Sequence, residues 1–164
     1  YKTVIYMCAH SKDGSMGIII NKKIDHDLYP DLLKQLGIDQ PLKNKKFFIR
    51  YGGPIESRRG FILHSDDSIR KETLSIDKGV ALTNTAGFFD DLAKNSGPKY
   101  SILALGYTGW GPGQLEYEIK KNSWVNLPIE SSFLFDEKVT TKWDDAYKLL
   151  GVNSSNLSIF SGNA

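Results

Sequence analysis

The residues with the clearest potential for chemistry are one cysteine and two histidines, Cys8, His10 and His64. Side chains alternate along a strand, so Cys8 and His10 are expected on one face. A Cys–His pair can activate a thiolate nucleophile or supply metal ligands, and His64 ends another apolar segment from which it can join them. The competing interpretation is a core cysteine with two strand-end histidines, because free cysteine is among the most buried residue types. The core interpretation is favoured, because the chain has no C-x-x-C or H-x-x-H pair of the kind that binds metals. We therefore expect no bound metal.

The glycine-rich segment 106–113 (GYTGWGPG) joins a buried strand to a helix, where α/β proteins often bind phosphate. It does not match G-x-G-x-x-G, because Gln114 takes the last glycine position, and no Gly-Lys-Ser/Thr follows as in a P-loop. Pro112 removes an amide donor, and Glu116 and Glu118 place negative charge near the start of the helix, which opposes an anion. We therefore expect no nucleotide and no other cofactor.

Two interpretations of this segment remain. Its glycines can allow close packing around the aromatic residues of the turn, or the turn can present those aromatic residues to a partner. In the second case we expect a binding surface formed by Arg59, His64, Tyr107, Trp110, Gln114 and Glu116. Glu116 and Glu118 lie two apart on a helix and face different directions, so we expect one to be exposed and one to reach back to the turn.

Basic residues concentrate between Lys34 and Arg59, a window with seven basic and two acidic residues and a net charge of +5, although the whole chain has +2. The basic residues are Lys34, Lys43, Lys45, Lys46, Arg50, Arg58 and Arg59. Such a patch can attract phosphate groups, so a transcriptional regulator that binds DNA directly is one alternative. No helix-turn-helix, zinc finger or basic helix accompanies the patch, and lysines also keep exposed loops soluble. Direct DNA binding is therefore not our leading hypothesis.

The hydrophobic pattern predicts a mixed α/β (α+β-like) fold without strict βαβ alternation. Asp13-Gly14 is a hairpin signal between two apolar runs, and residues 100–107 form the nearly continuous apolar run of a central strand. We expect strands at 1–8, 16–20, 47–51, 60–64, 74–76, 80–82, 100–107, 124–127 and 132–135. We expect helices at 28–36 with Asp27 as N-cap, at 83–94, at 114–121 and at 141–150.

Length and composition indicate an ordinary soluble domain. The 164 residues are 40% hydrophobic and 24% charged, which suits a single domain. One cysteine allows no intramolecular disulfide, and no apolar run is long enough to span a membrane. We therefore expect a cytoplasmic protein that does not associate with membranes.

Short motifs along the whole chain resemble the YqgE/AlgH family of bacterial proteins. The longest and most specific is Gly109-Trp110-Gly111-Pro112-Gly113-Gln114-Leu115-Glu116. Shorter matches are Val4-Ile5-Tyr6-Met7-Cys8 with His10, Asp13-Gly14-Ser15-Met16-Gly17, Gly52-Gly53-Pro54, Arg59-Gly60-Phe61, Leu63-His64 and Leu105-Gly106-Tyr107. Ser15 and Lys23 depart from the family pattern, which has alanine and often proline at these positions.

The resemblance implies a mixed, strongly bent, barrel-like sheet flanked by helices. It also implies a strand before the position of Tyr1, so we expect residues 1–164 to form a single domain that lacks an N-terminal strand. The family has no established activity, and its frequent description as transcriptional regulators follows from no DNA-binding motif. We therefore expect a non-enzymatic protein with a regulatory or partner-binding role, whose unknown partner is more readily a protein than a nucleic acid.

Overall fold

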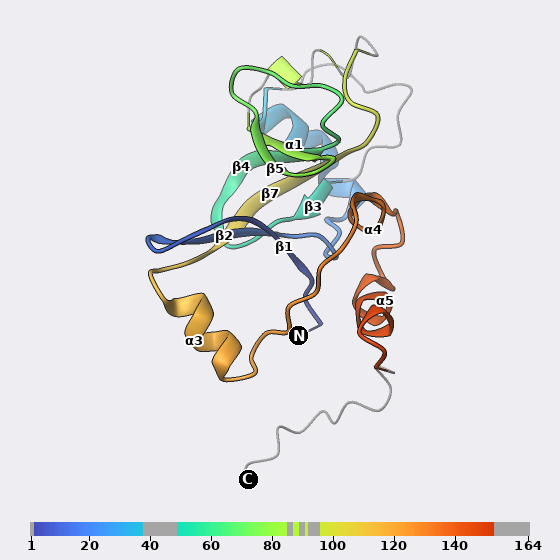
Figure 1. Cartoon of the computed structure of the whole chain (residues 1–164). Helices are drawn as coiled ribbons and strands as arrows, with labels where there is room; N and C mark the ends of the chain where they lie inside the picture. The colour runs from blue at the N-terminus through green and yellow to red at the C-terminus, as the bar shows by residue number, and fades with distance from the viewer. Residues whose placement is uncertain (1, 38–48, 85–86, 89–90, 92–95, 153–164) are drawn as a thin grey trace.

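The computed structural model describes residues 2–37, 49–84, 87–88, 91 and 96–152. Its centre is a mostly antiparallel sheet in the order β1-β2-β7-β4-β6-β5, with β3 pairing with β7 in parallel (Figure 1). The strands are β1 (Ile5–Ser11), β2 (Gly14–Ile19), β3 (Ile49–Tyr51), β4 (Ile55–His64), β5 (Leu74–Asp77), β6 (Val80–Thr83) and β7 (Ser101–Trp110).

The long strand β7 makes the sheet bend. Its first half pairs with β3, with Leu103 opposite Ile49, and its last residues pair with β2, with Trp110 opposite Ser15. On its other side it pairs with β4, whose register shifts between Ile55 and Gly60. A bulge of this kind bends a strand and increases its twist. The predicted strongly bent, barrel-like sheet is confirmed.

Alternation along β7 divides the core between the two faces of the sheet. Ile102 and Ala104 belong to a cluster that includes Leu134, whereas Leu103 and Leu105 belong to a second cluster. Helix α1 (Tyr29–Gln35) covers the second cluster with apolar side chains. The apolar run 100–107 therefore behaves as predicted, because a strand that is buried on both faces needs no polar alternation.

Glycines let the start of β4 approach β7 closely. Gly106 has φ +72°, and a Cβ built on it would lie 2.4 Å from the carbonyl oxygen of Gly53. The amide of Gly52 donates to the carbonyl of Leu105 at 2.8 Å. The two glycine motifs of the sequence are thus packed against each other by backbone contact, which only residues without Cβ allow.

The helices lie outside the sheet. A 3-10 turn at His26–Leu28 precedes α1, and further helices described over their whole length are α3 (Gln114–Lys120), α4 (Ser131–Phe135) and α5 (Lys142–Leu149). Asp27 lies within the 3-10 turn, and Leu28 is the N-cap of α1, so the predicted capping role of Asp27 is wrong. In Figure 1, α3 and α5 lie on either side of the chain that leads from α3 to α4.

Two of the predicted strands are wrong. Residues 132–135 form most of α4, and residues 124–127 belong to no strand or helix. Within the predicted helix at 83–94, Gly87, Phe88 and Asp91 are helical and Thr83 ends β6. Most of the other residues of that prediction lie outside the described residues. Within the described residues, no helix is both long enough and apolar enough to cross a membrane.

Candidate functional site

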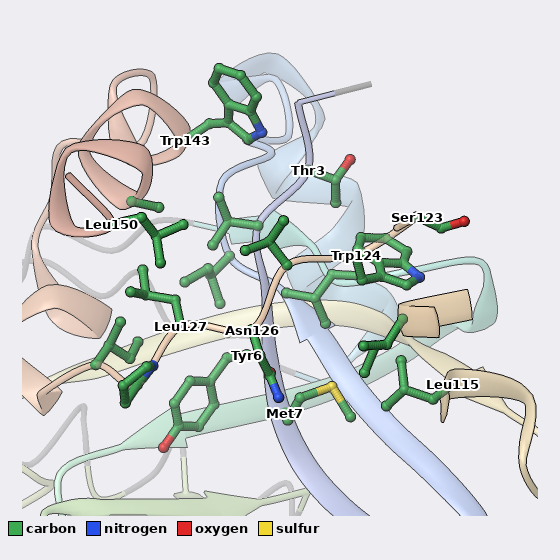
Figure 2. Close-up of a pocket in the computed structure, with 18 of the residues that line it drawn as sticks. Thr3, Tyr6, Met7, Leu115, Ser123, Trp124, Asn126, Leu127, Trp143 and Leu150 are labelled. Atoms are coloured by element: carbon green, nitrogen blue, oxygen red, sulfur yellow. The ribbon is translucent and has the colours of Figure 1, made fainter. Parts of the chain in front are cut away.

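A groove of about 710 Å³ lies between β1, α3, α5 and the chain from Asn122 to Ile129, and we call it the β1 groove. Figure 2 shows Tyr6 and Met7 of β1 facing into this space together with Trp124 and Leu127. Its volume is typical of a ligand site. Most of its lining residues are apolar or aromatic, and polar and apolar atoms contribute comparably to its surface. The aromatic lining residues are Tyr6, Trp110, Trp124, Phe133, Trp143 and Tyr147.

One wall of the β1 groove is a sheet edge. Among the described strands, β1 pairs only with β2. The amide of Ile20 donates to the carbonyl of Val4 at 3.0 Å, so Val4 and Tyr6 direct their backbone groups towards β2. Backbone groups alternate in an antiparallel pair, so those of Ile5 and Met7 point away from β2. No backbone hydrogen bond from the described loops and turns reaches the backbone groups of Ile5 and Met7. The groove therefore offers backbone donors and acceptors as well as apolar surface.

The opposite wall is one face of α5. Trp143, Ala146, Tyr147 and Leu150 line the β1 groove at the spacing of one helix face. A stripe of this kind predicts the buried side of a helix, and here it borders an open space instead. Leu149, which is 60% exposed, lies beside the stripe and outside the groove lining.

The end of the groove near α3 is fixed by Glu118. Its Oε2 accepts hydrogen bonds from Trp110 Nε1 at 2.9 Å and from Trp124 Nε1 at 2.6 Å, and its Oε1 accepts from Gln114 Nε2 at 2.9 Å. Gln114 Oε1 in turn accepts from the amide of Gly111 at 3.0 Å. The two indoles meet edge to face with centroids 6.0 Å apart. One carboxylate therefore holds both tryptophans against the glycine-rich turn.

Glu116 points the other way and stays partly exposed. Its Oε1 lies 3.5 Å from His10 Nε2, and His10 Nδ1 lies 2.7 Å from Ser15 Oγ. Both His10 and Glu116 line the β1 groove. The two glutamates therefore face different directions, as predicted. Glu118 reaches back to the glycine-rich turn, and Glu116 is partly exposed.

Cys8 and His10 do not share an environment. Cys8 is 6% exposed, and its Sγ donates to the carbonyl of Tyr6 at 3.6 Å, whereas the His10 side chain is 52% exposed. The register of β1 against β2 shifts between Met7 and Ala9, so Cys8 is the extra residue of a bulge. The bulge breaks the alternation on which the expected pairing of Cys8 with His10 was based. Burial also raises the pKa of the Cys8 thiol to about 12.

His64 is fully buried and makes two hydrogen bonds. Its Nδ1 lies 2.8 Å from the carbonyl oxygen of Ser65, and its Nε2 lies 2.9 Å from Thr83 Oγ1. Burial lowers the pKa of His64 below its ordinary 6.5, which favours the neutral ring. Within the described residues, no three His, Cys, Asp or Glu side chains are placed to hold a metal ion. The structure therefore does not bring Cys8, His10 and His64 together as a site.

The chain matches a family model along almost its full length. A model of AlgH-like proteins covers residues 1–155. The chain belongs to the AlgH-like family. Relatives include a UPF0301 protein of Beijerinckia indica, 44% identical over 99% of this chain and 83% of its own length, and one of Rhodospirillum rubrum, 41% identical over 99% and 84%. The resemblance to the YqgE/AlgH family is confirmed.

Solved structures agree with the AlgH-like fold. The solution structure of the AlgH protein from Pseudomonas aeruginosa is 34% identical and has a TM-score of 0.80, with 99% of this chain and 86% of that chain covered. A crystal structure of a protein from Corynebacterium diphtheriae has a TM-score of 0.68 at 17% identity, over 89% of this chain and 76% of that chain. At that identity the second match shows the fold alone.

The residues predicted to form one binding surface lie in different environments in this AlgH-like chain. Trp110 and Glu116 line the β1 groove, and Gln114 is exposed beside it. His64 is fully buried, so its expected place on an exposed surface is wrong. Tyr107 is half-buried and packs edge to face on Phe61, with centroids 5.5 Å apart.

Not all of the basic residues between Lys34 and Arg59 are exposed. Arg50 is 2% exposed, and Arg59 is exposed but its Nη1 lies 2.7 Å from Glu56 Oε2. Lys43, Lys45 and Lys46 lie outside the described residues. Of the described basic residues of this window, Lys34, Arg58 and Arg59 are exposed and Arg50 is buried.

Glu118 provides a direct test of the indole arrangement. Its hydrogen bonds to Trp124, Gln114 and Trp110 lower the pKa of its carboxyl below the ordinary 4.5. A carboxyl with a depressed pKa contributes stability above its unfolded pKa and loses it as the pH falls through the folded pKa. We expect the indole N–H signals of Trp110 and Trp124 to shift together only below pH 4.5 in an NMR titration.

The indole signal of Trp143 is the control, because this residue has no hydrogen bond to Glu118. In the Glu118→Gln variant both shifts should vanish, since the side chain no longer titrates. Movement of one indole without the other, or a midpoint above pH 4.5, would show that Glu118 does not hold both.

Proposed function

We propose that this AlgH-like protein is a non-enzymatic binding module whose β1 groove takes an extended segment of a partner protein. The observation that supports the proposal is a groove, lined mainly by apolar and aromatic residues, beside the edge of β1 at which no described strand pairs. An extended peptide can add to such an edge through backbone hydrogen bonds while alternate side chains fill pockets. A small organic ligand would use the pocket but would leave the backbone groups of Ile5 and Met7 without partners.

The lining suits alternate apolar side chains. Met7 and Leu115 border the end near α3, and Trp143 and Leu150 border the end near α5 (Figure 2). Aromatic anchors in a pocket typically dominate the binding energy of an interface. The backbone groups of the edge would set the register of the bound segment, and the aromatic residues would set its sequence preference.

A regulatory role follows if the partner is itself regulated by occupying the groove. We place the protein in the cytoplasm, because its single cysteine is a buried thiol and suits a reducing compartment. Direct DNA binding has less support, since Arg50 is buried and Arg59 pairs with Glu56.

The proposal is tested with fluorescein-labelled ten-residue peptides of alternating apolar and polar sequence, measured by fluorescence anisotropy. Leu150→Arg places a charge in the groove lining, and Leu149→Arg places the same charge on the neighbouring exposed residue outside it. We expect Leu150→Arg to weaken binding at least about tenfold and Leu149→Arg to leave it unchanged, because a tenfold change needs only about 1.4 kcal/mol.

Peptide N-methylation separates strand addition from side-chain binding alone. Methylation of the amides that face β1 should abolish binding, whereas methylation of the alternate amides should not. Absence of any bound peptide, or equal behaviour of the two arginine variants, rules out the proposal. Self-association that Leu150→Arg abolishes would make a second copy of the chain the occupant instead.

A further inference from the structure

Two positive side chains lie buried on the same side of the sheet. Arg50 of β3 and Lys142 of α5 are each 2% exposed. They are close enough that the charge of Arg50 contributes to lowering the pKa of Lys142, after burial itself, to about 8. Buried charges are normally paired, because removing an ion from water costs several kcal/mol even in a relaxed protein. This pair therefore requires an explanation.

Helix α4 offsets part of the cost of burying the charge of Lys142. Lys142 Nζ donates to the carbonyl of Phe133 at 2.5 Å and lies 3.5 Å from the carbonyl oxygen of Leu134, near the end of that helix. Cations are favourable beside the free carbonyls at a helix C-terminus. These carbonyls are neutral, however, so the full positive charge of Lys142 is solvated but not neutralised.

Nothing comparable offsets the cost of burying the charge of Arg50 among the described residues. Arg50 Nε and Nη1 are buried and have no hydrogen-bond partner among the described residues. A guanidinium cannot lose its proton in a protein, so Arg50 cannot escape the cost by becoming neutral. Within the described part of the chain, neither Arg50 nor Lys142 has a carboxylate within 4.0 Å. Glu137 and Asp136 act on them only through longer-range attraction.

We infer that Arg50 and Lys142 form a binding site for one anionic group, a carboxylate or a phosphate. The group accepts a hydrogen bond from a free Arg50 N–H and is attracted by Lys142. Charge-assisted hydrogen bonds of this kind are about twice as strong as neutral ones. A carboxylate or phosphate there would accept from a buried donor and offset part of the positive charge of the two buried cations, which no carboxylate within 4.0 Å in the described chain does.

The site lies one side chain behind the wall of the β1 groove. The ring of Phe133 lines the groove, and Lys142 Nζ lies 4.7 Å from the centroid of that ring. The anion site does not depend on peptide binding in the groove, so the two proposals can fail separately.

The test is thermal unfolding of the protein in sodium phosphate, sodium acetate and sodium chloride at equal ionic strength. We expect phosphate or acetate, but not chloride, to raise Tm by about 5 to 10 °C once in roughly 100-fold excess over the dissociation constant. The comparison of phosphate with acetate identifies which anionic group is preferred. Arg50→Met and Lys142→Met should each abolish the rise, and Arg59→Met, at an exposed arginine, should retain it.

A second measurement uses the unmodified protein and so does not depend on whether a variant folds. The Nε–H signal of one arginine in the NMR spectrum of the unmodified protein should shift with the effective anion and saturate. An equal rise in Tm with chloride, a rise retained in both methionine variants, or no shifting arginine signal would overturn the inference.

Discussion

Replacing Gly106 by alanine is expected to prevent stable folding at 25 °C or to remove at least about 4 kcal/mol from the free energy of unfolding, a loss that few single substitutions reach. The added Cβ would lie 2.4 Å from the carbonyl oxygen of Gly53 and 2.8 Å from that of Ile55. Both contacts are with backbone, so no side-chain rotation relieves them. Relief would require the start of β4 to move away from β7, the strand at the centre of the sheet.

Gly37→Ala is the matched control. Gly37 has the same φ of +72°, but a Cβ built on it meets no described atom within 4 Å. Its loss should be limited to the cost of a left-handed residue, about 1–2 kcal/mol. Urea unfolding followed by circular dichroism measures both variants. Equal losses would mean that the backbone conformation, and not the contact with Gly53, makes Gly106 necessary.

Local sequence predicted most of the elements because their signals are local. The Asp13-Gly14 turn sets the β1–β2 hairpin, and the apolar run of β7 and the periodicity of α5 are visible without tertiary information. Two errors fall in the short segments 124–127 and 132–135. A short apolar run fits either a strand or a helix, and only tertiary contacts decide between them.

The candidate site was harder to predict, because it depends on which helix faces and strand edges no other element packs against. The apolar stripe of α5 was visible in the sequence, but nothing local tells a core-facing stripe from one that borders a groove. Glu118 was expected only as one of two glutamates, and its bonds to Trp110 and Trp124 depend on where the chain returns after α3. The bulge that separates Cys8 from His10 likewise has no local signal.

These features favour binding over catalysis. The groups with catalytic potential are dispersed, with Cys8 and His64 in the core and His10 at the surface. Several aromatic residues, by contrast, converge on one groove beside the edge of β1 that pairs with no described strand. Binding needs shape and backbone donors, both of which the groove supplies, whereas nucleophilic catalysis by Cys8 would need a reachable thiolate with a base beside it.

The Cys8 thiol is therefore expected to react with a thiol reagent at least about 1,000-fold more slowly in the folded protein than in the unfolded chain at pH 7. Burial raises its pKa from 9.0 to about 12, so the reactive thiolate is about 1,000-fold rarer. Burial of the sulfur hinders the approach of the reagent further. Cys8 is the single cysteine of the chain, so absorbance after addition of a disulfide reagent reports on this residue alone.

The same protein in urea is the control for Cys8, since the unfolded chain exposes the thiol at its ordinary pKa. Native reaction as fast as in urea would restore the nucleophile hypothesis, because it would require a reachable Cys8 with a base to deprotonate it. Slow native reaction that accelerates only when the β1–β2 hairpin unfolds would mean that Cys8 serves packing. The partner-binding groove would then be the functional feature that this part of β1 supports, since Tyr6 and Met7 line it from the residues next to the buried thiol.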